Sequence, residues 1–169
     1  SALHAAGTPH FAETVVEGFS HPESVIAHDG MVYVANIGTE LQPTAMDGDG
    51  FISAVRPDGS ILERKFLPVQ GTLNAPKGMA IVGTTLYEAD INRIVGFALT
   101  TRKAVFELAV PETSFLNDLT VRDDHTLFAS ATDLGKIAEV DLTTRTYTFL
   151  ALPPLQGPNG LWYERSNNT

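Results

Sequence analysis

The sequence LNDLTVRDDHTLFASATDLGKIAEVD, residues 116–141, decides the fold class, because it contains one whole copy of a unit that recurs before and after it. An Asn-Asp pair opens an alternating run, a DDH turn leads to the run TLFASA, and a GK turn leads to a third run, IAEVD. Alternation of apolar and polar residues with period two, interrupted by turn residues, is typical of short antiparallel strands.

The same pattern occurs elsewhere in the chain. Residues 24–36, SVIAHDGMVYVAN, read as two strands around a DG turn, and residues 51–66, FISAVRPDGSILERKF, read as two more around a PDG turn. Residues 79–91 repeat the first hairpin, and residues 94–108 repeat the second with TTRK in place of PDG. The third copy ends with TTRT at the place of TTRK, so each copy is predicted to hold four strands.

The spacing of the copies indicates a β-propeller. Equivalent apolar positions are separated by 54, 40 and 42 residues, and they are Val25, Met79, Leu119 and Leu161. A period near 40 with four short strands in each copy is the signature of propeller blades. The longer first interval is explained by an inserted loop, GTELQPTAMDGDG, at residues 38–50.

We therefore expect an all-β fold, a β-propeller of four-stranded antiparallel blades that forms a single partial domain over residues 1–169. Because propellers usually close rings of roughly 4 to 8 blades, about three blades plus the first strand of a fourth leave two open sheet edges. The rest of the propeller or a second chain is expected to complete the ring. The expected ranges are 12–68 for blade 1, which includes the inserted loop, 75–110 for blade 2, 116–152 for blade 3 and 157–169 for the start of blade 4.

Composition excludes several classes of protein. The net charge of −9 argues against a nucleic-acid binder, since phosphate neutralisation needs clustered Lys and Arg. The absence of Cys excludes disulfides, thiolate zinc sites and thiol nucleophiles. No apolar run approaches the roughly 20 residues that span a bilayer, so no membrane partner is expected. The opening SALHAAGTPHF is no signal peptide but is compatible with the stub of one, which favours a periplasmic or extracellular protein over a cytoplasmic one.

Residues that directly precede the first strand of each blade are expected to meet at one mouth of the central channel. These segments are HPES at 21–24, APKG at 75–78, LND at 116–118 and GPNG at 157–160. Glu23, Asn117 and Asn159 would offer oxygen ligands there, which a hard cation such as calcium prefers. Each also has a plain structural interpretation, as a solvated acid or as a turn residue. Their recurrence at one phase of the repeat favours a shared metal site.

The segments PES, LND and PNGL resemble those of the regucalcin (senescence marker protein) and gluconolactonase family of six-bladed propellers, whose relatives include paraoxonase, diisopropyl fluorophosphatase and strictosidine synthase-like proteins. The resemblance covers nearly the whole chain as about half of such a ring. It implies a central calcium ion, or another divalent cation, for which Glu23 matches the family glutamate and Asn117 and Asn159 match the asparagines. The family's aspartate ligand would come from a fifth blade that this sequence lacks.

The resemblance implies a small-molecule substrate and calcium-dependent hydrolysis of lactones or related esters, with the metal as Lewis acid and an acidic residue activating water. Asp118 is the candidate base, although it could equally support the turn or a neighbouring ligand. Lys77 stands where paraoxonase-like proteins carry histidine, and it could donate a hydrogen bond to an oxyanion without replacing a neutral imidazole as base. Two alternatives stay open, a non-catalytic NHL-like propeller that binds a ligand or partner protein, and a strictosidine synthase-like lyase.

Two further features have structural interpretations. The DGDG run at residues 47–50 lacks the later ligands of an EF-hand loop, so we expect a flexible loop. Four aromatic residues fall at strand positions and are expected to pack between blades. They are Tyr33, Tyr87, Phe128 and Trp162.

Overall fold

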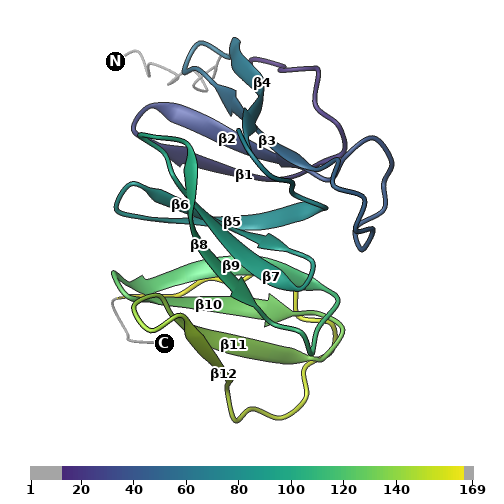
Figure 1. Cartoon of the computed structure of the whole chain (residues 1–169), viewed down its shortest axis with the longest axis vertical. Coiled ribbons are helices and arrows are strands. Elements are labelled where there is room, and N and C mark those ends of the chain that lie inside the picture. Colours follow the sequence, from purple (N-terminus) through teal and green to yellow (C-terminus); the bar gives the residue numbers. More distant parts are fainter. Residues whose placement is uncertain (1–12, 166–169) are drawn as a thin grey trace, which may run out of the picture.

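The computed structural model describes residues 13–165, and over that range it contains twelve strands and no helix. The strands form three separate four-stranded antiparallel sheets, each a meander in which consecutive strands pair. Figure 1 shows the sheets following one another along the molecule, with the first sheet at the top and the third at the bottom. The predicted all-β, propeller-like repeat is thus confirmed, and the described residues form an open series of sheets.

Each sheet corresponds to one copy of the sequence repeat. Sheet 1 consists of β1 (Pro22–His28), β2 (Met31–Asn36), β3 (Phe51–Val55) and β4 (Ile61–Leu67). Sheet 2 consists of β5 (Pro76–Val82), β6 (Thr85–Asp90), β7 (Arg93–Ala98) and β8 (Lys103–Ala109). Sheet 3 consists of β9 (Leu116–Asp123), β10 (Thr126–Ala131), β11 (Lys136–Asp141) and β12 (Thr146–Phe149).

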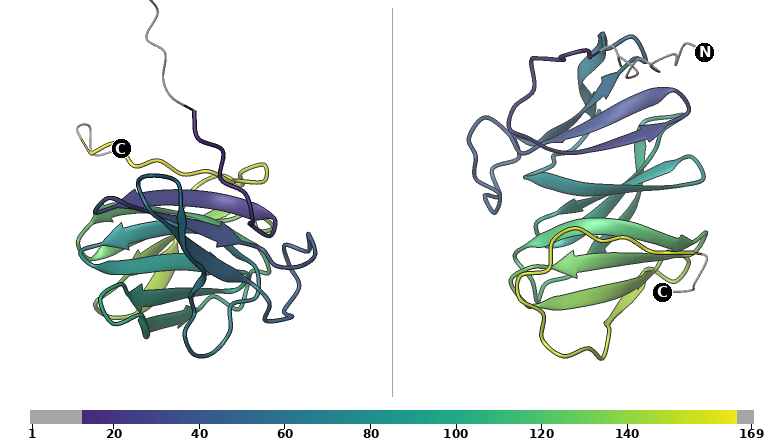
Figure 2. Two further views of the ribbon diagram at one scale, coloured as in Figure 1. Left: turned by 90° about the horizontal axis from the view of Figure 1, so that it is seen from above. Right: turned by 180° about the vertical axis from the view of Figure 1, so that it is seen from behind.

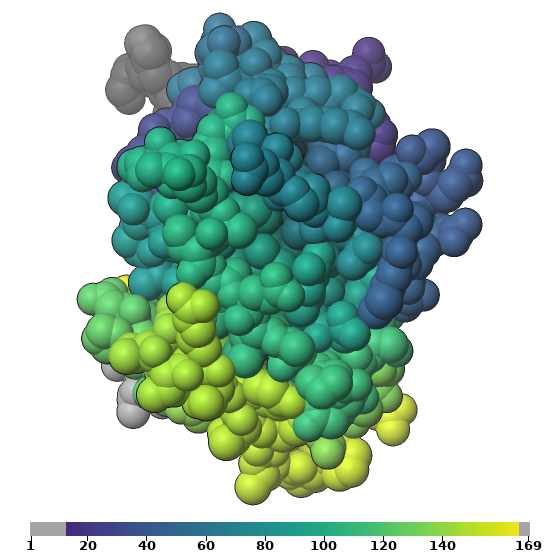
Figure 3. Space-filling model, viewed as in Figure 1, coloured from purple at the N-terminus to yellow at the C-terminus, as the bar shows by residue number. Residues whose placement is uncertain are grey.

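Turn chemistry explains why the first hairpin forms where the DG pair stands. Asp29 and Gly30 both have positive φ, 47° and 75°, as the central residues of a type I′ turn require. The inserted residues 38–50 lie between β2 and β3 and protrude at one side of the surface (Figure 3). Within this loop the backbone N–H of Thr39 donates to Asp49 Oδ2 at 2.8 Å, so the DGDG run closes its own loop.

The core lies between the sheets rather than within one of them. Alternate side chains of β2 and β6 face opposite neighbours, so Tyr33 packs between sheets 1 and 2 and Tyr87 between sheets 2 and 3. The first strands β1, β5 and β9 are in contact in that order, and Figure 2 shows the same succession of sheets from behind. No helix in residues 13–165 is long and apolar enough to cross a membrane.

Two expectations about the C-terminal segment are wrong. Residues 157–165 form no strand, because the N–H groups of Leu161 and Tyr163 bond to side chains of sheet 3 and the described residues supply no strand that pairs with this segment. Trp162 is 85% exposed instead of packed between blades, because no sheet lies beyond it in the part of the chain that the structure describes. The N-terminal stretch that suggested a signal-peptide stub falls in residues 1–12, outside the described range, as do residues 166–169.

Candidate functional site

The four segments predicted to line one mouth of the channel lie next to one another. Ser24 at the start of β1 donates a hydrogen bond from its hydroxyl to the carbonyl oxygen of Lys77 in β5. A Cβ on Gly78 would lie 2.3 Å from Asp118 Oδ1 and 2.7 Å from the carbonyl oxygen of Asn117, so only glycine allows β5 to approach β9 this closely. The GPNG segment follows, since Ser130 donates from its hydroxyl to the Asn159 carbonyl at 2.7 Å.

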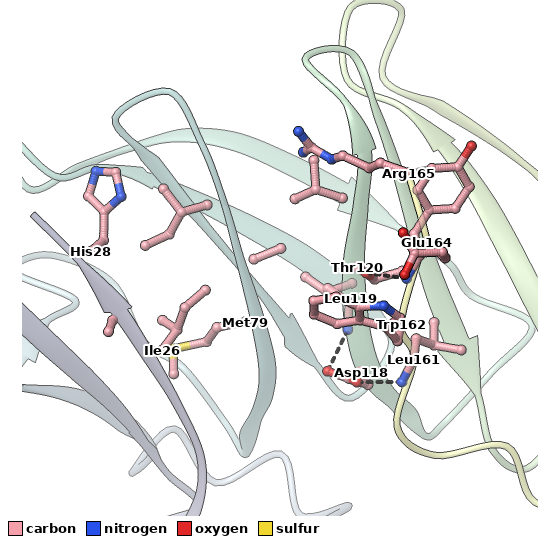
Figure 4. A pocket seen from close by; sticks show the side chains of 15 residues that line it. Ile26, His28, Met79, Asp118, Leu119, Thr120, Leu161, Trp162, Glu164 and Arg165 are labelled. Atoms are coloured by element: carbon pink, nitrogen blue, oxygen red, sulfur yellow. Dashed lines mark hydrogen bonds between the residues drawn. The ribbon is translucent and has the colours of Figure 1, made fainter. Parts of the chain in front are cut away.

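Asp118 connects β9 to the C-terminal segment. One carboxylate oxygen accepts from the backbone N–H of Leu119 at 2.9 Å, and the other accepts from the N–H of Leu161 at 2.7 Å (Figure 4). Its own backbone N–H donates to the Ser130 hydroxyl at 3.0 Å. The residue predicted as a base therefore holds backbone in place with both oxygens, and each oxygen keeps one further lone pair for a proton or cation.

Glu23 is the carboxylate that the site exposes to solvent. Although solvent reaches the side chain, the surrounding protein desolvates its carboxyl group and raises its pKa. The charge of Lys77 opposes this rise in pKa, and the charge of Asp118 adds to it. Two negative charges that repel each other across the mouth favour the uptake of a proton or of a cation at Glu23.

Lys77 lies behind the mouth rather than in it. Only 1% of the residue is exposed, its Nζ donates to the Ala75 carbonyl at 2.9 Å, and the ammonium lies 5.0 Å from the centre of the Phe115 ring. Burial lowers its pKa, while the neighbouring acids Glu88, Asp90 and Glu23 oppose that shift. A lysine placed this way would have to change rotamer before it could donate to a substrate at the mouth.

The predicted metal ligands differ in how accessible they are. Asn117 is 5% exposed, whereas Glu23 and Asn159 are exposed at the surface. Their side chains offer oxygen atoms that suit a hard cation, but three residues fall short of the roughly six to eight oxygens that calcium takes, so carbonyl groups, water or further residues would have to supply the rest. No three His, Asp or Glu side chains within residues 13–165 form a metal-binding group, and the predicted set contains only one carboxylate.

An apolar trough runs away from this mouth along the first strands. It has a volume of about 620 Å³, and its wall includes Ile26, Met79, Leu119 and Leu161. Figure 4 shows Asp118 at one end of the trough and His28 and Arg165 toward the other. Thr120 and Glu164 also line the trough, so its wall is mostly apolar but carries polar groups along its length as well as at its ends.

The sequence reading missed a fully buried acid, Glu88. It lies in β6 opposite Met79 and Val95, and neither carboxyl oxygen has a hydrogen-bond partner. Burial raises its pKa well above the usual value, and the neighbouring charge of Asp90 adds to this. A glutamate at an apolar phase of the alternating strand TLYEAD is the signal that could have identified it.

Polar anchors ahead of each first strand were also missed. Asn36 Oδ1 accepts from the backbone N–H of Ser20 at 2.8 Å, and Asp90 Oδ1 accepts from the N–H of Ala75 at 2.9 Å. Asp133 Oδ2 accepts in the same way from the N–H of Ser114 at 2.8 Å. Each side chain follows or ends the second strand of its sheet and fixes the segment that enters the first strand, which explains how the mouth segments keep their positions.

Comparison with known proteins supports the fold and leaves the family open. No protein-family model and no curated protein matches the chain. Among solved structures, the chain is similar to the extracellular domain of a proposed one-component system from B. thetaiotaomicron, with a TM-score of 0.57 and 12% sequence identity. The similarity covers 78% of this chain and 16% of that one, so the chain spans about a sixth of its length.

Proposed function

We propose that this chain contributes the first half of a six-bladed propeller whose complete form is a calcium-dependent hydrolase of lactones or related esters. The observation that carries the proposal is the meeting of four repeat-equivalent segments, where Ser24 contacts Lys77, Asp118 contacts Leu161, and the charge of Asp118 acts on Glu23. A ring would place the missing ligands opposite these residues, supplied by the rest of the propeller or by a second chain.

The residues would divide the work as follows. Glu23, Asn117 and Asn159 would hold the cation, which when bound polarises the carbonyl of the substrate as a Lewis acid. Asp118 would keep the backbone at Leu161 in place and could accept a proton from water on a free lone pair. The buried ammonium of Lys77 would add positive charge behind the site without touching the substrate.

Calorimetric titration with Ca²⁺ tests the ligand assignment. We expect Glu23→Gln and Asn159→Ala each to weaken binding by about tenfold or more, which corresponds to at least about 1.4 kcal/mol. Asp124→Asn is the control, because Asp124 is an exposed acid just after β9, at the far end of that strand from Asp118. Calcium affinity that stays the same in both site variants contradicts the assignment.

A non-catalytic propeller that resembles NHL-type repeats is the second candidate. Two observations favour it, since Asp118 already uses both carboxylate oxygens on backbone groups and Lys77 is enclosed. A panel of lactones assayed with and without a chelator separates the two functions, because a binding module shows no chelator-sensitive turnover. A strictosidine synthase-like lyase remains a third alternative for the same ring.

The expected location is outside the cytoplasm. The composition of the N-terminal stretch favours export, and the similar structure from B. thetaiotaomicron is an extracellular domain. Fractionation of the native host with an antibody against the chain would test this expectation.

A further inference from the structure

Residues 157–165 lie where the first strand of a next sheet would lie. In the repeat, Leu161 is equivalent to Leu119 of β9 and to Met79 of β5. Asp118 accepts a hydrogen bond from the backbone N–H of both Leu119 and Leu161, with one carboxylate oxygen for each. The segment is also held at Tyr163, whose N–H donates to the Thr120 hydroxyl at 3.2 Å, so it runs beside β9 in an extended path.

The outer face of sheet 3 is equivalent to faces that are buried elsewhere in the molecule. Sheet 2 buries Ala80, Tyr87 and Ile94 against sheet 3. The strand registers assign Thr120, Phe128 and Ile137 to the same places in sheet 3. Together with Leu150 and residues 161–163 they line a groove of about 300 Å³, which we call the sheet 3 groove. Its rim carries the exposed indole of Trp162.

A recurring arginine marks how one sheet attaches to the sheet before it. Arg102 and Arg145 stand at the same place in the turns TTRK and TTRT, both with left-handed φ, 61° and 56°. Arg102 donates from Nε to the carbonyl of Phe66 in β4 at 3.2 Å, and Arg145 donates to the carbonyl of Val105 in β8 at 3.0 Å. Each guanidinium also lies over an aromatic ring of the preceding sheet, Phe66 or Phe106.

At the opposite end of the molecule, an N-terminal segment occupies part of the face that a second copy of this chain would have to present to the groove. Gly59 occupies the turn position of these arginines in sheet 1, and a Cβ there would lie 2.6 Å from Thr14. Arg64 donates from Nε to the Gly18 carbonyl at 2.7 Å. Residues 14–18 thus already lie where the fourth strand of a preceding sheet would lie, and they partly cover the apolar face that includes Val32 and Val55.

We propose that the sheet 3 groove binds a three-stranded antiparallel segment of the same repeat, which pairs its first strand with residues 161–163 and completes a four-stranded sheet. Such a segment would bury the groove as sheet 3 buries the equivalent face of sheet 2, and its turn arginine would meet a carbonyl of β12. This inference concerns the partner of the fold and holds whether or not the complete ring is a hydrolase.

The chain's own repeat provides the probe. Because Tyr163 is equivalent to Ile81, residues 1–163 can be followed directly by a copy of residues 82–110, which carry the second, third and fourth strands of sheet 2. Hydrogen exchange would follow the amides of the added strands. We expect protection of at least about 100-fold over an unfolded chain, since isolated hairpins are marginal without a packed face. Trp162 is the only tryptophan, so the quenching of its fluorescence by a dissolved quencher should fall as the new strands cover its side chain.

Variants of the groove decide whether docking causes the protection. Phe128→Asp together with Ile137→Asp should abolish protection of the added strands, whereas Leu62→Asp, at an exposed position in β4, should leave it unchanged. A second extended chain, with a copy of residues 122–152 in place of 82–110, guards against an extension that cannot fold for its own reasons. The proposal is overturned if neither extension is protected while sheets 1 to 3 stay folded, or if protection survives the double variant or disappears on dilution.

Discussion

The interface between sheets 1 and 2 and the interface between sheets 2 and 3 are built on the same repeat but differ in polarity. Between sheets 2 and 3 the place equivalent to Glu88 lies in a hydrophobic cluster that includes Leu119, Leu127 and Ala138. Between sheets 1 and 2 an equally apolar cluster surrounds Glu88, which is fully buried with no hydrogen-bond partner. The equivalent residues are Val34 in sheet 1 and Ala129 in sheet 3, as their pairing with Val25 and Leu119 shows.

Packing of the repeat does not require an ionisable group at this position, yet sheet 2 carries one, Glu88. Burial of a carboxyl group without a partner costs stability, and the group responds by staying protonated. The positive charges of Lys77 and Arg93 oppose the rise in the pKa of Glu88 without cancelling it. A residue kept at an energetic cost beside the mouth segments is a candidate for a functional role.

The largest expected effect comes from placing a carboxylate in the apolar interface. Ala129→Glu sets a glutamate at the position equivalent to Glu88 but in the hydrophobic cluster between sheets 2 and 3. We expect a loss of about 3 to 5 kcal/mol in the free energy of unfolding, measured by chemical denaturation. A loss below 1 kcal/mol would show that the two interfaces bury charge equally well.

The reverse change should stabilise the protein. Glu88→Val gives sheet 2 the residue that sheet 1 carries at the equivalent position, and it removes the desolvated carboxyl group. We expect the free energy of unfolding to rise by about 1 to 4 kcal/mol at pH 7, because a buried carboxyl group without a hydrogen-bond partner is replaced by a packed apolar side chain. Val34→Ala is the matched control at the equivalent position, and it should only destabilise. If Glu88→Val is less stable than the wild type, the interaction between Lys77 and Glu88 stabilises the protein.

The pH dependence of stability should separate Glu88 from the other acids. Its pKa is raised in the folded state, so folding binds a proton, and stability should fall as pH rises from about 4.5 toward the folded pKa. The fall approaches about 1.4 kcal/mol per pH unit at most. Acids with lowered pKa, such as Asp123 at about 2, act in the opposite direction at lower pH. The difference between wild type and Glu88→Gln, followed by thermal unfolding against pH, should show this slope, and parallel curves would contradict it.

The smallest effects should come from the turn arginines. Arg102 contacts the Phe66 carbonyl, the Phe66 ring at 4.2 Å and Glu63, whereas Arg145 contacts a carbonyl and the Phe106 ring at 5.4 Å. Substitution by Asn keeps a residue that tolerates positive φ. We expect Arg102→Asn to cost about 1 to 2 kcal/mol and Arg145→Asn about 1 kcal/mol or less in urea titrations. Equal costs would show that the turn, not the arginine contacts, attaches the sheets.

Much of the fold could be predicted from the residues alone. The DG pair at Asp29 and Gly30 fixed a hairpin because both residues accept the left-handed conformation of a type I′ turn. The alternation around it set which side chains face a neighbouring sheet, as the burial of Tyr33 and Tyr87 shows. The prediction for Trp162 was wrong, because alternation assigns a side chain to a face of the sheet but does not show whether another sheet covers that face.

The candidate site was predictable only in outline. Repeat phase grouped Glu23, Asn117, Asp118 and Asn159, and the structure brings the segments that carry them to one mouth. Sequence could not show that Asp118 accepts a hydrogen bond from Leu161 or that Lys77 lies under Phe115, because these contacts join residues from different repeats.

The sequence by itself determined the strands, the turns and the order of the sheets, because period-two alternation and turn chemistry act within a few residues of each other. Only the tertiary structure decided which polar groups are exposed and which are enclosed, since burial depends on the neighbouring sheet. Glu88 differs from Ala129 by its side chain, but its lack of a partner is a property of the interface between sheets 1 and 2. The stretch at residues 116–141 specifies a sheet in the same way, and its neighbours decide what that sheet can bind.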